Sequence, residues 1–329
     1  MRRTIASIAL VVALIPLAAC SSTNTNSSGT AKTSEAASSN KNILLITNSL
    51  GEEYWTASAN AVKAEGQKLG YTVTVTSHNG DNKKESELVD AAIATKPAAV
   101  LLDPANADGS IGAVQKLVDA KIPVFIVNAE INKEGLAKAQ LVSDNAQGAA
   151  LGAQQFAKEL GGKGTYVQLN GPSSDNNAIA RANGFKSVLS QYPDLKNVQT
   201  QSIPWDTTVG RNTTQSMLQA HPGVNAVLAS GDGFAVGAVA ALLQAGEAGK
   251  IKVGGFDGSP QAVKYVKAGY MFYTVLQPVV EFSAKAVDEA DQYLKTGKTG
   301  ADAEKQLFNC TLITPANANK YTGPYTLSQ

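Results

Sequence analysis

The chain has 329 residues, of which 43% are hydrophobic and 17% are charged, a composition typical of globular proteins. Its 28 basic and 27 acidic residues nearly balance, and the sequence contains no basic run or basic helix face. We therefore expect no nucleic-acid partner, because binding to phosphates requires clustered positive charge. After the first twenty residues, no apolar stretch approaches membrane-spanning length.

The first twenty residues have the pattern of an export signal. Arg2 and Arg3 precede an apolar run over residues 5–17, which is too short to span a bilayer of about 30 Å. Small residues then lead into Cys20, as in a bacterial lipobox, where the cysteine is lipidated and becomes the mature N-terminus. We expect 1–20 to be a signal peptide with a lipobox and the protein to be extracytoplasmic, held at the cell membrane only by lipid on Cys20. The alternative is a plain secretory signal.

Residues 21–40 are almost entirely Ser, Thr, Asn, Gly and Ala. Such a segment cannot bury enough apolar surface to offset the entropy cost of ordering, so it predicts a flexible linker. About 290 residues follow, more than one hydrophobic core usually organises, which predicts two lobes. If Cys20 is lipidated, only Cys310 is left, so we expect no disulfide and a buried small apolar side chain at Cys310.

From residue 42 onward, short apolar runs alternate with helical patterns. Strands are predicted first at 43–47, 71–76, 98–102 and 123–127, with helices at 57–69, 83–95 and 111–120. After a break, strands are predicted at 165–169, 198–203, 224–229, 251–256 and 272–276, with helices at 177–190, 208–219, 234–244 and 260–267. A helix at 279–294 and a strand at 308–313 end the pattern. This alternation predicts two parallel sheets covered by helices, with a cleft between them.

Polar and aromatic side chains follow the predicted strands. In open parallel sheets, ligands bind beyond the carboxyl ends of the strands. Those positions are 48–55, Asp103, Asn128, 170–177, Trp205, Asp206, Asp232, Asp257 and Gln277. Carboxylates and amides match hydroxyl groups, and Trp or Tyr faces cover C–H surfaces, so the pattern predicts a polyhydroxyl ligand. The sequence lacks the usual metal and nucleophile motifs, so we expect no enzyme, no metal and no cofactor.

Several segments, in their order and spacing, resemble the ribose-type family of periplasmic sugar-binding proteins that feed ABC importers. They are Tyr54-Trp55, 121–124, 171–178, 221–227, 254–260, Gln277-Pro278 and 312–315. The resemblance implies an α/β fold of two doubly wound parallel-sheet lobes joined by a three-strand hinge, the type I periplasmic binding protein. It implies an N-terminal lobe of 41–143 plus 277–308, a C-terminal lobe of 144–276 plus 309–329, and delivery of ligand to an ABC permease by hinge closure.

The resemblance also implies site residues. Tyr54, Trp55 and Trp205 fall where the family places aromatics against the sugar, and Asp257 and Gln277 fall on hydroxyl-binding positions. Asp175 and Asn177 match a segment of xylose-binding relatives, and Asn128 takes the place of a family Asp. The chain departs from the pattern where Ala129 and Ile179 replace arginines, where Glu52 replaces a frequent Asn, and where Gly231-Asp232 replaces an Asn-Asp pair.

Two missing guanidiniums mean two missing multi-donor clamps on a sugar. We therefore expect a small neutral sugar alcohol (a tetritol or pentitol) or a pentose, bound by a monomer. The predicted ligand-binding set is Glu52, Tyr54, Trp55, Asn128, Asp175, Asn177, Trp205, Asp232, Asp257 and Gln277.

Simpler roles remain open for several of these residues. Tyr54 and Trp55 would be core aromatics, Asp175 and Asp232 helix N-caps, and Asn177 a solvated side chain. Asp257 would be a turn residue and Trp205 a cover for the hinge. Arg181 is expected to be a structural ion-pair partner and is left out of the set.

Two other functions compete with solute capture for import. One is a sensory protein of the same fold that presents a sugar-like signal to a membrane receptor. The other is a nicotinamide-dependent oxidoreductase, because residues 231–237 follow a strand and open a helix. Their glycines, however, are spaced GxGxxxG rather than GxGxxG.

Overall fold

The computed structural model describes residues 40–328, which lie within one compact unit of the chain. The predicted signal peptide, the lipidation site Cys20 and residues 21–39 of the predicted linker lie outside the described residues. Among the helices of the described part, none is both long and apolar enough to cross a membrane.

The first lobe is built on a six-stranded, all-parallel sheet with the strand order β11-β5-β4-β3-β1-β2. Its strands are β1 (Asn42–Thr47), β2 (Thr72–Ser77), β3 (Ala99–Leu102), β4 (Val124–Asn128), β5 (Ala139–Ser143) and β11 (Lys305–Phe308). Its helices are α1 (Glu53–Lys68), α2 (Asn82–Thr95), α3 (Ile111–Asp119) and α9 (Val279–Thr296). β3, β4 and β5 are buried along their whole length, as expected of parallel strands that helices cover on both faces.

The second lobe has a four-stranded parallel sheet in the order β7-β6-β8-β9. Its strands are β6 (Gly164–Asn170), β7 (Leu195–Ser202), β8 (Ala226–Ala229) and β9 (Lys252–Gly254), and its helices are α4 (Asn145–Glu159), α5 (Asn176–Leu189), α6 (Thr207–Ala220), α7 (Asp232–Ala245) and α8 (Pro260–Ala268). β10 (Thr274–Leu276) and β12 (Thr311–Ile313) form a separate antiparallel pair. The chain ends in a 3-10 turn, η1 (Ala318–Lys320), and a hairpin of β13 (Tyr321–Gly323) and β14 (Thr326–Leu327).

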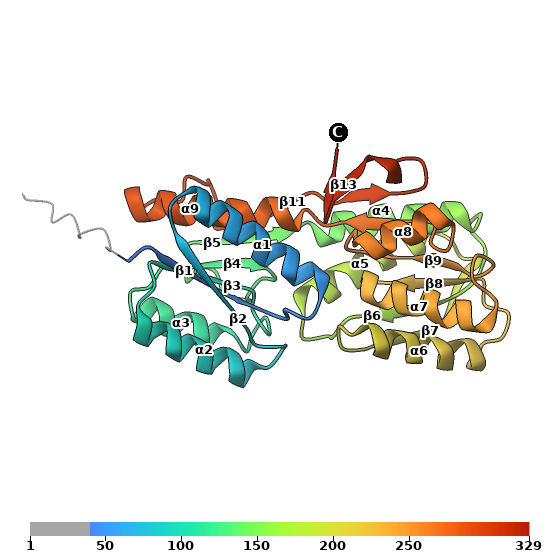
Figure 1. Ribbon diagram of the computed structural model, residues 1–329. Coiled ribbons are helices and arrows are strands. Elements are labelled where there is room, and N and C mark those ends of the chain that lie inside the picture. Colours follow the sequence, from blue (N-terminus) through green and yellow to red (C-terminus); the bar gives the residue numbers. More distant parts are fainter. Residues whose placement is uncertain (1–39, 329) are drawn as a thin grey trace, which may run out of the picture. The chain divides into compact units, whose positions relative to one another are not determined.

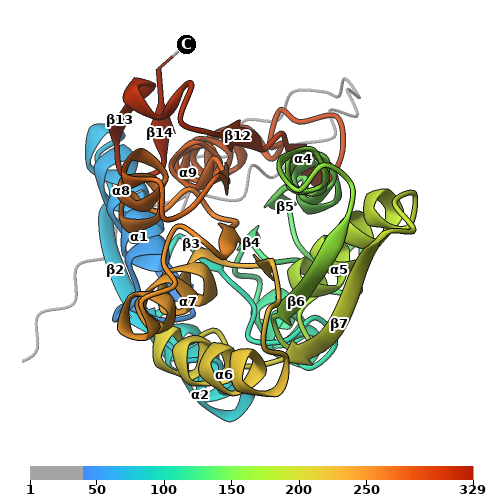
Figure 2. The same ribbon diagram turned by 90° about the vertical axis from the view of Figure 1, so that its right-hand side faces the viewer.

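Three connections join the lobes: β5 to α4, β10 to α9, and β11 to β12 (Figure 1). Seen end-on, helices lie around the strands of the second lobe except at β7, the exposed edge strand (Figure 2). The expected fold, two parallel-sheet lobes with a three-strand hinge, is therefore confirmed. The residue numbers expected to divide the lobes stay a prediction.

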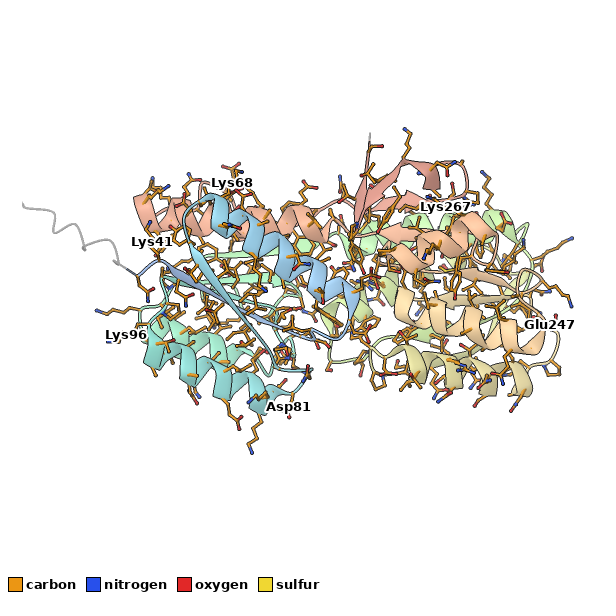
Figure 3. All side chains as sticks on the ribbon, viewed as in Figure 1. Lys41, Lys68, Asp81, Lys96, Glu247 and Lys267 are labelled. Carbon is orange, nitrogen blue, oxygen red and sulfur yellow. The ribbon has the colours of Figure 1, made fainter. Side chains whose placement is uncertain are left out.

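Three parts of the chain differ from the sequence-based expectation. β5 and α4 lie between residues 127 and 165, where the sequence pattern predicts neither a strand nor a helix. The single strand expected at 308–313 is wrong. The chain instead crosses between lobes at Asn309 and Cys310, which separate β11 from β12. Cys310 is buried and free, and burial raises the pKa of its thiol to about 12. Charged side chains such as Lys68, Lys96 and Lys267 lie on the outside (Figure 3).

Candidate functional site

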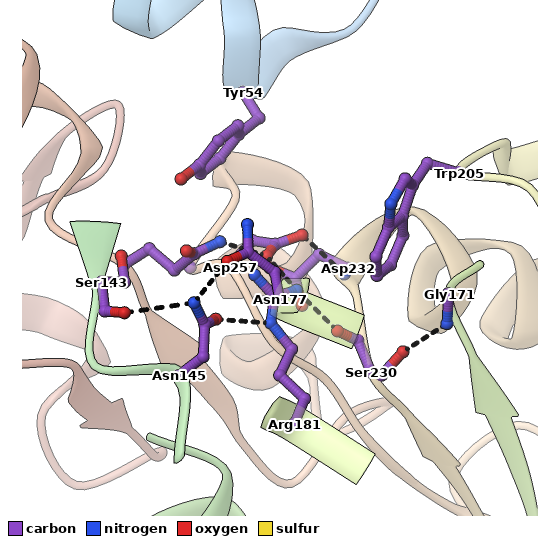
Figure 4. A network of polar contacts seen from close by, with 12 residues as sticks. Tyr54, Ser143, Asn145, Gly171, Asn177, Arg181, Trp205, Ser230, Asp232 and Asp257 are labelled. Atoms are coloured by element: carbon purple, nitrogen blue, oxygen red, sulfur yellow. Dashed lines mark hydrogen bonds and ion pairs between the residues drawn. The ribbon is translucent and has the colours of Figure 1, made fainter. Parts of the chain in front are cut away.

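A cavity of about 170 Å³ lies where the carboxyl ends of the two parallel sheets face each other. The structure places all ten predicted ligand-binding residues on its wall. They are Glu52, Tyr54, Trp55, Asn128, Asp175, Asn177, Trp205, Asp232, Asp257 and Gln277. Figure 4 shows part of the polar network, with Tyr54 pointing from α1 toward side chains of the second lobe. The first-lobe and hinge residues thus share one chamber with those of the second lobe.

The first-lobe wall is organised around Asn128, the last residue of β4. Its side-chain oxygen accepts a 2.8 Å hydrogen bond from the Tyr54 hydroxyl, and its Nδ2 donates to both carboxyl oxygens of Asp103 at 3.1 and 3.2 Å. Its backbone is left-handed, with φ of 67°, a conformation that asparagine tolerates better than most residues. Tyr54 and Asp103 therefore fix the orientation of the Asn128 amide at the cavity wall.

Asp103 lies behind this wall and is 2% exposed. Burial raises the pKa of its carboxyl to about 8, against the lowering effect of the Asn128 amide. The indole N–H of Trp55 also faces the carboxyl and lowers its pKa, but the approach falls short of hydrogen-bond geometry. The Asp103 backbone carbonyl is bonded to His78 Nε2 at 2.8 Å, and Gly80 N–H donates to His78 Nδ1, so the proton of that ring is on Nε2.

The second-lobe wall begins at Asp175, which has two roles. Its Oδ1 accepts from the Asn177 backbone N–H at 2.8 Å as the N-cap of α5, and its Oδ2 accepts from Trp205 Nε1 at 2.7 Å. The Trp205 ring stacks on Phe234 with centroids 5.0 Å apart and planes 10° apart. Asp175 therefore caps a helix and also holds the indole at the cavity.

Arg181 forms the base of the second-lobe wall and is 3% exposed. Its Nε donates to Asn145 Oδ1 at 2.7 Å, and its Nη1 donates to the Ser230 carbonyl at 2.7 Å and to Asp257 Oδ1 at 3.1 Å. Gln277 Nε2 donates to the same Asp257 oxygen at 2.7 Å. Burial raises the pKa of Asp257, while the Arg181 charge opposes that rise. The expected ion-pair role of Arg181 is confirmed, and the residue also lines the cavity.

Asp232 is not the N-cap of α7, so that interpretation is wrong. The N-cap is Gly231, and Asp232 is the first residue of the helix. Its carboxyl accepts from the Ser259 backbone N–H at 2.7 Å and from the Thr274 hydroxyl at 2.8 Å. Burial, together with the neighbouring Asp257 charge, raises its pKa well above the usual range. Its partners lie far along the sequence, so no local pattern could indicate them.

Direct contacts join the two lobes beside the cavity. The Asn177 side chain is 7% exposed and donates through Nδ2 to the Asn128 backbone carbonyl at 3.1 Å, so the solvated alternative for Asn177 is wrong. Asn176 Nδ2 donates to Asn132 Oδ1 at 2.7 Å. These bonds connect α5 of the second lobe to the segment after β4 of the first.

The most notable lining residue that sequence reasoning missed is Tyr325 of the C-terminal hairpin. Ile179, which stands where the family has an arginine, is 42% exposed and does not line the cavity. Within residues 40–328, no group of three or more His, Cys, Asp or Glu side chains is arranged to hold a metal ion.

Residues 43–299 match the periplasmic binding protein domain family, which covers most of the chain. The chain is 42% identical to a D-apiose import binding protein of Paraburkholderia graminis over 93% of this chain and 96% of that protein. It is 31% identical to a ribose import binding protein of Salmonella typhimurium over 79% of this chain and 86% of that one.

A solved structure of a periplasmic solute binding protein is also similar to this chain. An ABC transporter periplasmic solute binding protein from Actinobacillus succinogenes, with bound D-allose, superposes with a TM-score of 0.80 at 28% identity and covers 85% of this chain and 99% of that one. The chain belongs to the ribose-type family of periplasmic binding proteins, a family of solute-binding proteins.

Proposed function

We propose that this protein captures a small neutral carbohydrate, a pentose or a short sugar alcohol, in the interlobe cavity and delivers it to an ABC importer. The observation that carries the proposal is the convergence of the ten predicted residues, from both lobes and the hinge, on one chamber of about 170 Å³. A chamber of this size suits a single sugar better than a longer saccharide.

The polar lining suits hydroxyl groups. Carboxylates only accept hydrogen bonds, whereas amides and hydroxyls both donate and accept. The faces of Trp55 and Trp205 cover the C–H surfaces of the same ligand.

The charge of the lining supports a neutral ligand. Among the described residues, six carboxyl side chains line the cavity. The same lining includes one guanidinium and no lysine or histidine. The guanidinium, on Arg181, is already paired with Asp257. A sugar acid or sugar phosphate would bring another negative charge into this field, so we expect such ligands to be rejected.

The relatives point to the first ligands to try. The D-apiose import binding protein at 42% identity favours a pentose, and the ribose relative favours the same class. Ligand bridging both lobes would stabilise their closed arrangement by no more than its differential affinity for the closed and open states. The same import relatives do not favour the sensory alternative.

The scheme requires no chemistry on the ligand. The oxidoreductase alternative depended on residues 231–237, but the Asp232 carboxyl there is engaged by Ser259 and Thr274. Capture and release by two lobes account for the lining without a reaction. We therefore propose a binding protein rather than an enzyme.

The cellular setting is part of the proposal. Export through residues 1–20 and lipidation of Cys20 would hold the protein outside the cytoplasm at the cell membrane, next to its permease. The linker would let the folded part act as a monomer that reaches the permease. Globomycin, an inhibitor of the lipoprotein signal peptidase, should block processing of the wild type in cells. A Cys20→Ala variant should abolish membrane retention.

The binding proposal can be tested by fluorescence, because the chain has two tryptophans and both line the cavity. Titration with D-apiose, D-ribose or xylitol should change the emission saturably and raise Tm, since a ligand of the native state stabilises it. Trp55→Phe and Trp205→Phe should each remove part of the signal. The proposal fails if no neutral sugar or polyol changes either the emission or Tm.

A further inference from the structure

The C-terminal hairpin carries an aromatic side chain into the cavity. β13 and β14 are joined through Pro324 and Tyr325, and the Tyr325 side chain is 3% exposed and lines the chamber. Figure 1 shows β13 close to α8, and η1, which precedes it, packs on that helix. The last residues of the described chain therefore form part of the wall of a site otherwise built from strand ends and helix starts.

The backbone at Tyr325 is strained. Its φ is 54°, in the left-handed region that bulky residues rarely occupy. A turn with proline at its second position and a positive φ at its third usually has glycine or asparagine at the third. A tyrosine there costs conformational free energy, and such costs cluster at functional sites where the surrounding structure enforces them.

Specific contacts enforce the position. The Tyr325 backbone N–H donates to the Tyr321 hydroxyl oxygen at 2.7 Å, and the Tyr321 hydroxyl donates to the Gly258 carbonyl at 3.0 Å. Gly258 directly follows the lining residue Asp257. On the other side, the Tyr325 ring meets the Tyr54 ring edge-on, with centroids 5.3 Å apart and planes at 90°. The ring is therefore anchored at the second lobe and touches the first.

The chemistry of the ring suits an end wall. Burial and the nearby Asp257 and Asp232 carboxyls raise the pKa of the Tyr325 phenol, which therefore stays protonated. It offers a flat apolar face and a neutral hydroxyl, and with Tyr54 it bounds one side of the space open to a ligand. Tyr54 is held by Asn128, so it cannot easily move aside to make room.

We propose that Tyr325 is a specificity-determining residue that limits the length of the ligand and favours five-carbon over six-carbon sugars and sugar alcohols. This inference rests on the proposed function. A missing or added carbon in an enclosed site changes affinity by about tenfold or more, so removal of the ring should change the ratio of affinities rather than abolish all binding.

The test is calorimetric titration of the full chain with xylitol and D-ribose as five-carbon probes and with sorbitol and D-allose as six-carbon probes. Tyr325→Asn removes the ring and suits the positive φ, and Tyr325→Gly is the second variant should the first fail to fold. We expect the six-carbon to five-carbon affinity ratio to rise by about tenfold in either variant. Tyr325→Phe, which keeps the ring, should leave the ratio close to that of the wild type.

Tyr192→Asn is the matched control, because Tyr192 is 37% exposed and does not line the cavity. An unchanged ratio in a folded Tyr325→Asn or Tyr325→Gly protein overturns the role of Tyr325 even if the wild type binds these probes. D-apiose and erythritol are titrated beside the four probes, and whichever short ligand the wild type binds serves as the reference for the ratio. If the wild type binds none of these six compounds, the proposed function itself fails, and the inference fails with it.

Discussion

The buried Arg181 and the partly exposed Asp257 form an ion pair at the base of the cavity, with Nη1 and Oδ1 3.1 Å apart. Breaking a buried pair from one side leaves an uncompensated charge, at a cost of about 3 kcal/mol. We predict that Arg181→Met lowers the free energy of unfolding by about that amount, measured by urea denaturation. In the wild type, the Arg181 charge opposes the effect of burial on the pKa of Asp257. That pKa should therefore rise further in the variant, which lacks the charge.

Arg211→Met is the matched control for this prediction. Arg211 is exposed and donates through Nη2 to Gln244, so its loss should change stability by less than about 0.5 kcal/mol. Equal urea midpoints for Arg181→Met and the wild type would show that the pair is not a stabilising element of the fold.

The contact between Asn176 and Asn132 predicts that a residue outside the cavity lining affects ligand affinity. Asn176 does not line the cavity, and its 2.7 Å bond to Asn132 joins the lobes. Asn176→Ala removes this bond and the longer 3.4 Å bond from Nδ2 to Glu130 Oε1. A net loss of about 1 kcal/mol would shift the balance away from the closed arrangement. Asn176→Ala should therefore raise Kd about fivefold, measured by titration. Asn212→Ala, on an exposed face of α6, is the control, and equal Kd values for all three proteins would contradict the prediction.

Asp103 predicts a pH dependence of stability. Its pKa is about 8 in the fold against 3.8 for the free side chain, so the folded state holds a proton that the unfolded state has released between these values. This contribution to stability is complete below about pH 4 and is lost as the pH rises to about 8, by up to about 1.4 kcal/mol per pH unit. Asp103→Asn cannot titrate. From pH 5 to pH 8 the wild type should lose more stability than this variant in urea denaturation, and parallel losses would disprove the assignment.

Gly171 predicts a packing effect on the site. A Cβ at Gly171 would collide with the Trp205 ring, and one at Gly231 would lie 2.8 Å from the same ring. Gly171→Ala should displace the indole and, at about 1.4 kcal/mol of overpacking, weaken ligand binding about tenfold. Gly112→Ala in α3 meets no neighbouring atoms and should leave Kd unchanged. If Gly171→Ala and Gly112→Ala have the same Kd, the close approach of the Gly171 backbone does not position the Trp205 ring for binding.

The sequence predicted much of the site because its residues follow strands. Asn128 ends β4 and Trp55 opens α1, so the alternation of strands and helices alone brings them to one edge of a sheet. The same rule predicts the side of the sheet on which Asp257 lies. The rule cannot predict which hydrogen-bond partner each side chain takes. For that reason the N-cap interpretation of Asp232 is wrong: its carboxyl instead accepts from Ser259 and Thr274.

Other misses have physical causes of their own. α4 contains Gly148 and Gly152, which weaken a helix signal but let the helix approach Cys310 and Tyr273 closely. The Gly-Pro-Tyr sequence at 323–325 indicates a turn, but nothing local shows that the turn returns to the cavity. Tyr325 is placed there by its contacts with Tyr54 and Tyr321, which only the folded chain provides.

The most direct measurement is isothermal titration of the folded protein with D-apiose, D-ribose and xylitol, beside ribose 5-phosphate as a charged comparison. The account predicts one site per chain for at least one neutral ligand, with Kd of about 1 μM or tighter, and no detectable binding of the phosphate. It would be contradicted if none of the neutral ligands releases or absorbs heat, or if the phosphate binds more tightly than the neutral ligands do.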